Sequence, residues 1–335
     1  MDFLDIKSRI ALKYKVSLRI KFLADTFYDE NGLVDSERRN RYLTLSKNIN
    51  DCHKFVEMAV CNFDGIRYLH KTMCCDFKFC PICARKRYLK YLALLCPVFE
   101  KLIDENKYIC MLNLTIKNTK TFEEGKAKLF EAWRIMTNTN KLSSRLFNFH
   151  IIGGLKSFEI TYNQIDKTWH PHFHILIVKE KFSRDFELLK TLWEQACQIV
   201  FNTEEKVGSI YIEGIKDKNN KTQSYMRDKK SIVNGVIECV KYVTKFWFKD
   251  EFDNPKSIFE IYNDEQIIEL IDGLKGVRTL STFGCLFGYQ KRLNEIKADG
   301  DEEKLKKHVC KACGCSSFYY ETEIISKIDS LETFD

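Results

Sequence analysis

Three of the chain's seven histidines, His170, His172 and His174, stand at alternate positions and lead directly into an apolar run at 175–178. In an extended strand alternate side chains share a face, so the three imidazoles would line one side and Phe173 the other. Imidazoles that converge at the mouth of a buried strand are typical of metal ligands. The simpler alternative is a run of solvent-exposed histidines at a strand edge.

A carboxylate can complete this ligand set. If the polar residues 163–168 form the turn of a hairpin, Glu159 lies opposite His172 and on the same face of the sheet. Two histidines and a carboxylate leave open positions for water or substrate oxygens. We favour His172 and His174 as the histidine ligands, with His170 as a further ligand or a substrate contact. Non-haem Fe(II) oxygenases use the same set, but that class explains neither the cysteines nor the helix described next.

A second chemical pattern lies at 234–249, where the apolar periodicity predicts a helix. Glu238, Tyr242 and Lys245 stand at i, i+4 and i+7, so they share one helical face. A phenol becomes a nucleophile when a metal, a base or a cation favours its phenolate. Glu238 could then accept a proton, and Lys245 could stabilise negative charge. By itself, the pattern also fits an ordinary solvent-facing helix with a Glu/Lys pair.

Cysteines before residue 84 have the spacing of a structural zinc site. Cys75, Cys80 and Cys83 supply three thiolates, and we favour Cys52 as the fourth ligand. The alternatives for that fourth position are Cys61, His70 and Cys74. A cluster of buried thiols without metal is the simpler interpretation.

A second zinc-like group stands near the other end of the chain. Its candidate ligands are His308, Cys310, Cys313 and Cys315. The chain has 14 cysteines, yet its first residues lack a secretory signal, so a disulfide scaffold is not expected. No apolar run approaches the roughly 18–20 residues of a membrane span. We therefore expect a cytoplasmic protein that contacts no membrane.

The charge of the chain favours a polyanionic partner without proving one. The formal net charge is +7. Arg85, Lys86 and Arg87 follow the first cysteine group and would begin a helix suited to DNA phosphates. The alternative is an ordinary solvated helix face.

The elements that would position these groups indicate an α+β protein. Strands are expected at 108–117, 155–162, 168–178 and 209–215, and helices at 1–50, 83–102, 122–142 and 186–201. Two central strands joined by a short hairpin favour an antiparallel sheet with flanking helices over a doubly wound parallel fold.

Taken together, these motifs resemble a known family. The chain is similar to the rolling-circle replication initiators of small bacterial plasmids, in the HUH endonuclease superfamily. The similarity rests on the cysteine block at 75–87 and on three ordered segments: Leu112-Asn113-Leu114-Thr115-Ile116-Lys117-Asn118, His170-Pro171-His172-Phe173-His174-Ile175-Leu176, and Glu238-Cys239-Val240-Lys241-Tyr242-Val243-Thr244-Lys245. One tyrosine in the last segment resembles the single-tyrosine subgroup, and Tyr225 is a weaker second candidate.

The resemblance implies a mechanism. Tyr242 would attack a phosphate of single-stranded DNA at the double-strand origin, leaving a 5′-phosphotyrosine and a free 3′-OH. Mg²⁺ or Mn²⁺ on His172, His174 and Glu159 would polarise that phosphate. Glu238 would activate water when replication terminates and the strands are rejoined. A transposase with the same chemistry, or a non-catalytic zinc-containing DNA-binding protein, is the alternative.

The resemblance also implies partners and a division of the chain. The expected partners are the plasmid origin, as a single-stranded or hairpin nick site, the host helicase and polymerase, and a second copy of the chain. The expected regions are an N-terminal helical and zinc-like DNA-binding region (1–105), a nickase domain (106–252) and a C-terminal helical region with the cysteine knuckle (253–335).

Overall fold

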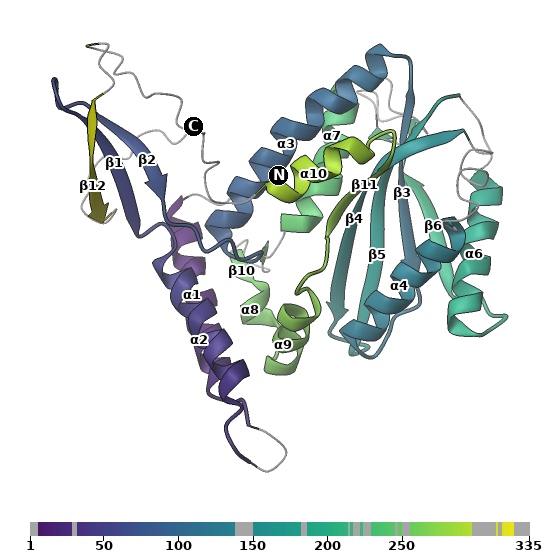
Figure 1. The fold of residues 1–335 in the computed structure, drawn as a ribbon. Helices are drawn as coiled ribbons and strands as arrows, with labels where there is room; N and C mark the ends of the chain where they lie inside the picture. Colours follow the sequence, from purple (N-terminus) through teal and green to yellow (C-terminus); the bar gives the residue numbers. More distant parts are fainter. Residues whose placement is uncertain are drawn as a thin grey trace. The chain divides into compact units, whose positions relative to one another are not determined.

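The computed structural model of the chain describes residues 6–28, 32–137, 150–181, 186–213, 215–216, 222–223, 229–244, 247–249, 255–296, 313 and 317–324 (Figure 1). Contacts divide the chain into two compact units, each assembled from separate stretches of sequence. The first unit comprises Met1–Arg87, Phe246–Asn263 and Ile296–Asp335, and the second comprises Tyr88–Lys245 and Asp264–Glu295. The boundaries of these two units differ from those of the three consecutive regions expected from the sequence. The functions assigned to those three regions stay predictions.

The second unit is built on a five-stranded sheet with the order β11-β4-β5-β3-β6, in which all neighbouring strands are antiparallel. Its strands are β3 (Tyr108–Ile116), β4 (Ile151–Asn163), β5 (Thr168–Lys179), β6 (Gly208–Glu213) and β11 (Leu280–Gly284). Strand β5, which carries the histidines, is central because β4 and β3 pair with its two edges. The predicted α+β class with a central antiparallel sheet is confirmed.

Helices cover the two faces of this sheet. The described helices of the second unit are α3 (Pro81–Asp104, which begins in the first unit), α4 (Phe122–Thr137), α6 (Phe186–Phe201), α7 (Lys229–Thr244), α9 (Asp264–Gly273), α10 (Gln290–Glu295) and the short 3-10 helix η1 (Phe287–Tyr289). Figure 1 shows α4 on one side of the sheet and α7, which contacts β4 and β5, on the other. The short strands β7 (Ile215–Lys216) and β8 (Thr222–Gln223) pair with each other.

Aromatic packing fixes which face of the hairpin is buried against α4. Phe130 of α4 packs edge-on against Phe158 of β4 and Phe173 of β5, with ring centroids 5.2 Å and 5.1 Å apart. Both strand residues neighbour polar site residues in sequence, and neighbouring strand residues point to opposite faces. The apolar face therefore packs against α4, which directs Glu159 and His172 to the other face of the sheet.

The first unit combines a helical hairpin with a small sheet. Helices α1 (Ile6–Ala24) and α2 (Ser36–Asp51) pack together, and the buried hydroxyls of Ser17 and Ser46 each donate to the other residue's carbonyl. Asp35 caps α2 by accepting from the backbone N–H of Arg38. The central strand β1 (Phe55–Cys61) lies between β2 (Arg67–Thr72) and β12 (Phe318–Ile324), and both pairs are antiparallel. The unit also contains β9 (Trp247–Lys249), β10 (Pro255–Ser257) and α8 (Ile258–Ile261).

Three sequence expectations need correction. The helix expected at 234–249 begins at Lys229 and ends at Thr244, and the short strand β9 follows it. The region beyond 253 is not only helical, because β11 extends the central sheet and β12 joins the first unit. The segment 52–83, for which no strand was expected, contains the β1–β2 hairpin. Strands β11 and β12 each pair with a strand that is remote in sequence, β4 and β1 respectively, and local patterns do not encode such pairing.

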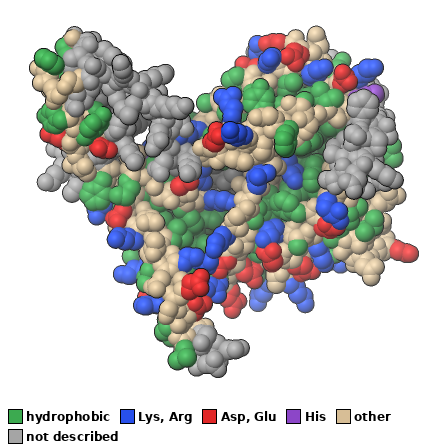
Figure 2. Space-filling view, in the orientation of Figure 1, with side chains coloured by type: hydrophobic (Ala, Val, Ile, Leu, Met, Phe, Trp, Pro, Cys, Tyr) green, Lys and Arg blue, Asp and Glu red, His purple; other side chains and the backbone are tan. Residues whose placement is uncertain are grey.

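Within the described residues, no helix has an apolar stretch long enough to cross a lipid bilayer. On the face drawn in Figure 2, lysine and arginine side chains are interspersed with acidic ones and do not form a single basic patch.

Candidate active site and metal centres

The β4–β5 hairpin places Glu159 directly opposite His172 in the sheet. Glu159 Oε2 lies 2.7 Å from His172 Nε2 and 3.0 Å from His174 Nε2. The ligand atoms of these three residues all lie within 4.8 Å of one another. The register predicted from the polar turn is confirmed, and the structure brings together the three favoured metal ligands.

The second ring nitrogen of each imidazole is held by an acceptor. Nδ1 of His172 donates to the backbone carbonyl of His170 at 3.2 Å, and Nδ1 of His174 donates to Asn113 Oδ1 at 2.6 Å. In the absence of metal, Nε2 of each ring, the nitrogen that faces Glu159, donates to the carboxylate, whereas a neutral imidazole that donates through Nδ1 can offer the lone pair of Nε2 to a cation. Two imidazole nitrogens and a carboxylate oxygen therefore converge, which is a donor set that fits a divalent cation.

Sequence reasoning assigned no role to Asn113. This residue lies in β3, directly opposite His174 of β5. Its signal was available, because it is an amide within the otherwise largely apolar and buried strand YICMLNLTI. The partner could not be identified, because the pairing of β3 with β5 joins residues 61 positions apart.

Burial and charge make Glu159 an anionic ligand. The side chains of Glu159 and His174 are 13% and 8% exposed. Burial by itself raises the pKa of Glu159, but hydrogen bonds from His172 and His174 outweigh it and lower the pKa to about 2. The carboxylate is therefore ionised throughout the neutral range.

His170 lies at the edge of this group, beside a polar pocket of about 390 Å³. The other lining residues are Asn118, Thr161, Tyr162 and Asn163. The imidazole is half-buried, its ring centroid is 5.0 Å from that of His172, and burial lowers its pKa. His170 thus faces a space that can admit substrate, whereas His172 and His174 face Glu159.

Helix α7 carries the predicted nucleophile on its last turn. Its backbone places Tyr242 one turn after Glu238, and the helix contacts β4 and β5. Glu238 forms an ion pair with Lys241, a neighbour not included in the prediction. The side chain of Tyr242 and the whole of Lys245 lie outside the part of the chain that the structure describes. The described residues therefore place the helix but not the phenol.

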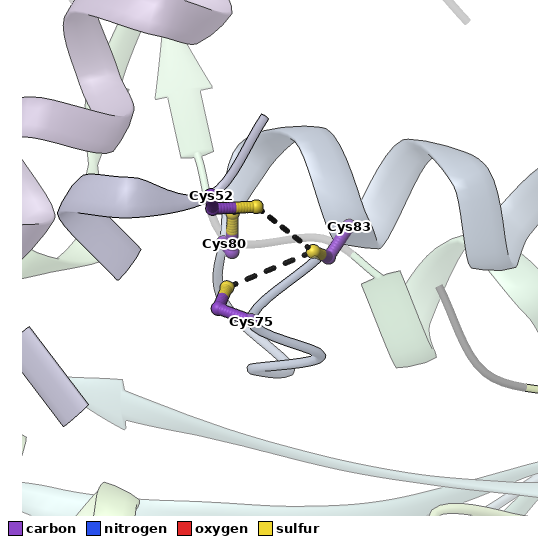
Figure 3. Close-up of side chains that lie close together, drawn as sticks. All are labelled: Cys52, Cys75, Cys80 and Cys83. Atoms are coloured by element: carbon purple, nitrogen blue, oxygen red, sulfur yellow. Dashed lines mark hydrogen bonds between the residues drawn. The ribbon is translucent and has the colours of Figure 1, made fainter. Parts of the chain in front are cut away.

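Four cysteine side chains of the first unit converge at the start of α3 (Figure 3). Cys83 Sγ lies 3.4 Å from Cys52 Sγ and 3.7 Å from Cys75 Sγ, and Cys80 Sγ lies 3.8 Å from that of Cys52. Hydrogen bonds from Cys52 and the neighbouring thiols hold the pKa of Cys83 below its usual range. The structure thus brings Cys52 to the three cysteines with zinc spacing, and four sulfurs at these distances fit a tetrahedral zinc ion.

Two residues of the basic run 85–87 form hydrogen bonds within the first unit. The guanidinium of Arg87 is buried, lies 3.3 Å from Asp76 Oδ1 and donates to the carbonyls of Asp76 and Phe77. Lys86 donates to Thr72 Oγ1 at 3.1 Å. Contrary to the expectation of a DNA-facing run, Arg87 is turned inward and supports the loop that bears Cys75. DNA contact by Arg85 and Lys86 stays a prediction.

Of the predicted C-terminal group, Cys313 belongs to the described residues, while His308, Cys310 and Cys315 lie outside them. Cys313 does not stand by itself, because its sulfur lies 3.5 Å from that of Cys61 at the end of β1. This contact was not expected from the sequence.

Comparisons with known proteins agree on one family. Residues 66–315 match the model of a family described as "Replication protein". A "Protein rep" from Bacillus sp. is 25% identical over 291 residues, covering 79% of this chain and 86% of the relative. A "Protein rep" from Streptococcus pneumoniae is 26% identical over 242 residues (69% of this chain, 66% of the relative), and one from Bacillus amyloliquefaciens is 24% identical over 285 residues (78% and 76%). No solved structure gives a significant match.

Proposed function

The chain belongs to the replication protein family that matches residues 66–315, and we propose that it initiates plasmid replication by cutting one DNA strand at an origin. The observation that carries the proposal is the convergence of Glu159, His172 and His174 on the face of the sheet opposite α4. Helix α7, which bears Tyr242, contacts the two strands that supply these ligands. The names of the relatives support the biological role.

The metal would be held by Nε2 of His172 and His174 and by the carboxylate of Glu159. When bound there, Mg²⁺ or Mn²⁺ supplies Lewis-acid polarisation of a phosphate oxygen. Asn113 and the carbonyl of His170 position the two imidazoles, because each accepts the Nδ1 proton. Three protein ligands leave room for phosphate oxygens and water, as a catalytic site requires.

Tyr242 would be the nucleophile. Its phenolic oxygen forms a bond to the phosphorus of one phosphodiester, and the bond from that phosphorus to the 3′-oxygen breaks. The phenolic proton passes to a base, and the departing oxygen takes up a proton to become the 3′-OH that primes synthesis. Lys245, three residues further on, would stabilise the negative charge of the phosphate.

Glu238 would act at termination. A carboxylate one turn before the tyrosine can take a proton from water, whose oxygen then attacks the phosphotyrosine, or from a DNA 3′-hydroxyl, whose attack on the same phosphorus rejoins the strand; in both cases the phenolic oxygen of Tyr242 leaves and takes up a proton. Its ion pair with Lys241 would hold the carboxylate in place. The polar pocket beside His170 would receive a nucleotide next to the scissile phosphate, since its amide, hydroxyl and aromatic side chains can contact a base.

In the first unit, Cys52, Cys75, Cys80 and Cys83 would bind a structural zinc ion. The four sulfurs leave no position for substrate, and the helix that follows supplies no carboxylate in its first turn. We propose that this centre shapes the DNA-binding part of the first unit and takes no part in the chemistry.

The decisive experiment traps the covalent intermediate. Wild-type protein is incubated with Mn²⁺ and labelled single-stranded DNA from its own plasmid origin, then separated on a denaturing gel. We expect an adduct that Tyr242→Phe abolishes while DNA binding is kept. Tyr211→Phe, a change at an exposed tyrosine of β6, is the matched control and should form the adduct normally. An adduct that persists in Tyr242→Phe would show that Tyr242 is not the nucleophile. DNA binding by the wild-type protein without any adduct would support a non-catalytic protein.

A further inference from the structure

We propose that Cys61, Asp64 and Cys313 hold a second structural zinc ion, which fastens β12 to the β1–β2 hairpin. The sulfurs of Cys61 and Cys313 lie 3.5 Å apart, although the residues are separated by 252 positions in sequence. The ligand atoms of all three residues lie within 4.8 Å of one another. This group shares no residue with the Cys52 cluster.

The β1–β2 turn presents two of these ligands together. Gly65 N donates to the carbonyl of Cys61 at 3.0 Å, and Cys61 N donates to the carbonyl of Ile66 at 2.9 Å. Gly65 has a φ of +69°, which glycine adopts without the steric cost that a Cβ brings. The turn therefore has the form of a zinc knuckle, in which two ligands separated by two residues precede a glycine.

The same spacing of candidate ligands before a glycine occurs a second time in the sequence. Cys61-Asn62-Phe63-Asp64-Gly65 corresponds in spacing to Cys310-Lys311-Ala312-Cys313-Gly314. The structure describes Cys313 of that second segment, and Cys310 lies outside the described residues.

The pairing of β1 with β12 brings Cys61 close to the segment that contains Cys313. Cys61, the last residue of β1, is opposite Phe318, the first residue of β12. Next to this pair, Asn62 N donates to the carbonyl of Ser317 at 3.1 Å, and its side-chain amide donates to Ser317 Oγ at 2.5 Å. The approach of Cys313 to Cys61 is thus a consequence of an ordered β1–β12 junction.

The third ligand favours a metal over a disulfide. A disulfide between Cys61 and Cys313 would give the carboxylate of Asp64 no role. When both thiols are deprotonated, two thiolates and a carboxylate at this distance repel one another, and a divalent cation offsets that repulsion. Asp64 Oδ1 accepts from Ile66 N at 2.9 Å. This hydrogen bond orients the carboxylate, as hydrogen bonds to neighbouring groups commonly orient metal ligands.

Zinc content per chain tests this site. The full-length protein is purified, dialysed against Mg²⁺ to displace zinc from the histidine site, and analysed for zinc. We expect about two zinc ions per chain in the wild type and about one in Cys61→Ser and in Cys313→Ser, since each structural centre binds a single ion. Cys285→Ser removes an exposed cysteine of the second unit and should leave the zinc content unchanged.

Two further measurements test the site even if a cysteine variant fails to fold. Asp64→Asn keeps both sulfurs, and we expect it to lose zinc to a chelator faster than the wild type. In Co²⁺-loaded protein, sulfur-to-cobalt charge-transfer absorption should fall in Cys313→Ser and disappear only when Cys80→Ser is added. Wild-type protein with about one zinc ion, zinc content unchanged in Cys313→Ser, or a Cys61–Cys313 disulfide found by mass spectrometry of the native protein would overturn the proposal.

Discussion

The histidine site of the second unit and the cysteine sites of the first differ in how the chain assembles them. Glu159, His172 and His174 come from one hairpin, and Asn113, a described residue that is distant in sequence, touches a ligand and not the metal position. Cys61 and Cys313, in contrast, are in contact although 252 positions separate them in the sequence. The nitrogen–oxygen site is partly open, whereas the four-sulfur cluster is closed. We infer that the histidine site is catalytic and that the cysteine sites stabilise the fold.

The largest effect is expected from breaking the four-sulfur cluster. Cys80→Ser removes a fully buried sulfur, so the protein should lose one zinc ion and unfold with a free energy lowered by about 4 kcal/mol or more, because zinc binding is coupled to folding. Zinc analysis and denaturant unfolding measure both. Cys96→Ser, at a half-buried cysteine outside the cluster, is the control. Unchanged stability in Cys80→Ser would remove the architectural role.

Breaking the histidine site should greatly reduce activity and leave the fold intact. Glu159→Gln keeps the shape but removes the anionic ligand, so nicking should fall by about 100-fold or more, equivalent to roughly 3 kcal/mol. Nicking kinetics at saturating Mn²⁺ and the circular dichroism spectrum are the measurements. EDTA should stop wild-type nicking in the same way, and added Mn²⁺ should restore it. Full activity in EDTA would contradict a metal-dependent reaction.

Acid should destabilise the metal-free protein through Glu159 of the histidine site. The pKa of Glu159 is lowered to about 2 in the folded metal-free protein, so its contribution to stability is present above its unfolded pKa, near 4.5, and is lost as pH falls toward 2. That contribution is at most about 3 kcal/mol. Chelated wild-type protein should therefore be destabilised over this range more steeply than Glu159→Gln. Parallel unfolding curves for the two proteins between pH 5 and pH 2 would contradict this assignment.

The smallest effect is expected at Asn113. Asn113→Ala removes the acceptor for His174 Nδ1, so Mn²⁺ affinity should fall by about 10–100-fold while the maximal nicking rate changes less. Asn113→Asp keeps an acceptor and should recover most of the affinity. Isothermal titration with Mn²⁺ separates these outcomes, and equal affinity in Asn113→Ala and the wild type would show that the contact does not position the ligand.

The sequence predicted what depends on neighbouring residues. The alternation in β5 and the polar turn before it were sufficient to place Glu159 opposite His172, because a short turn fixes the register of a hairpin. The spacing of Cys75, Cys80 and Cys83 likewise indicated one cluster.

What could not be predicted depends on pairing between remote strands. Neither the partner of Asn113 nor the addition of β11 to the central sheet has a local signal, since many strands of similar composition could occupy those edges. Arg87 was expected on the surface because charged side chains usually are. Its inward position depends on Asp76, which has a positive φ of 50° in the loop between β2 and α3.

The pairing of β12 with β1 has a consequence for synthesis of the protein. A ribosome releases β1 and β2 early, but their third strand emerges only after every described element of the second unit. The nascent first unit must therefore wait with the hydrogen-bonding edge of β1 open, and such edges readily recruit foreign strands. A chain that stops before residue 318 would keep the strands of the central sheet but leave that edge permanently exposed. Premature termination should thus yield a protein that aggregates through its first unit.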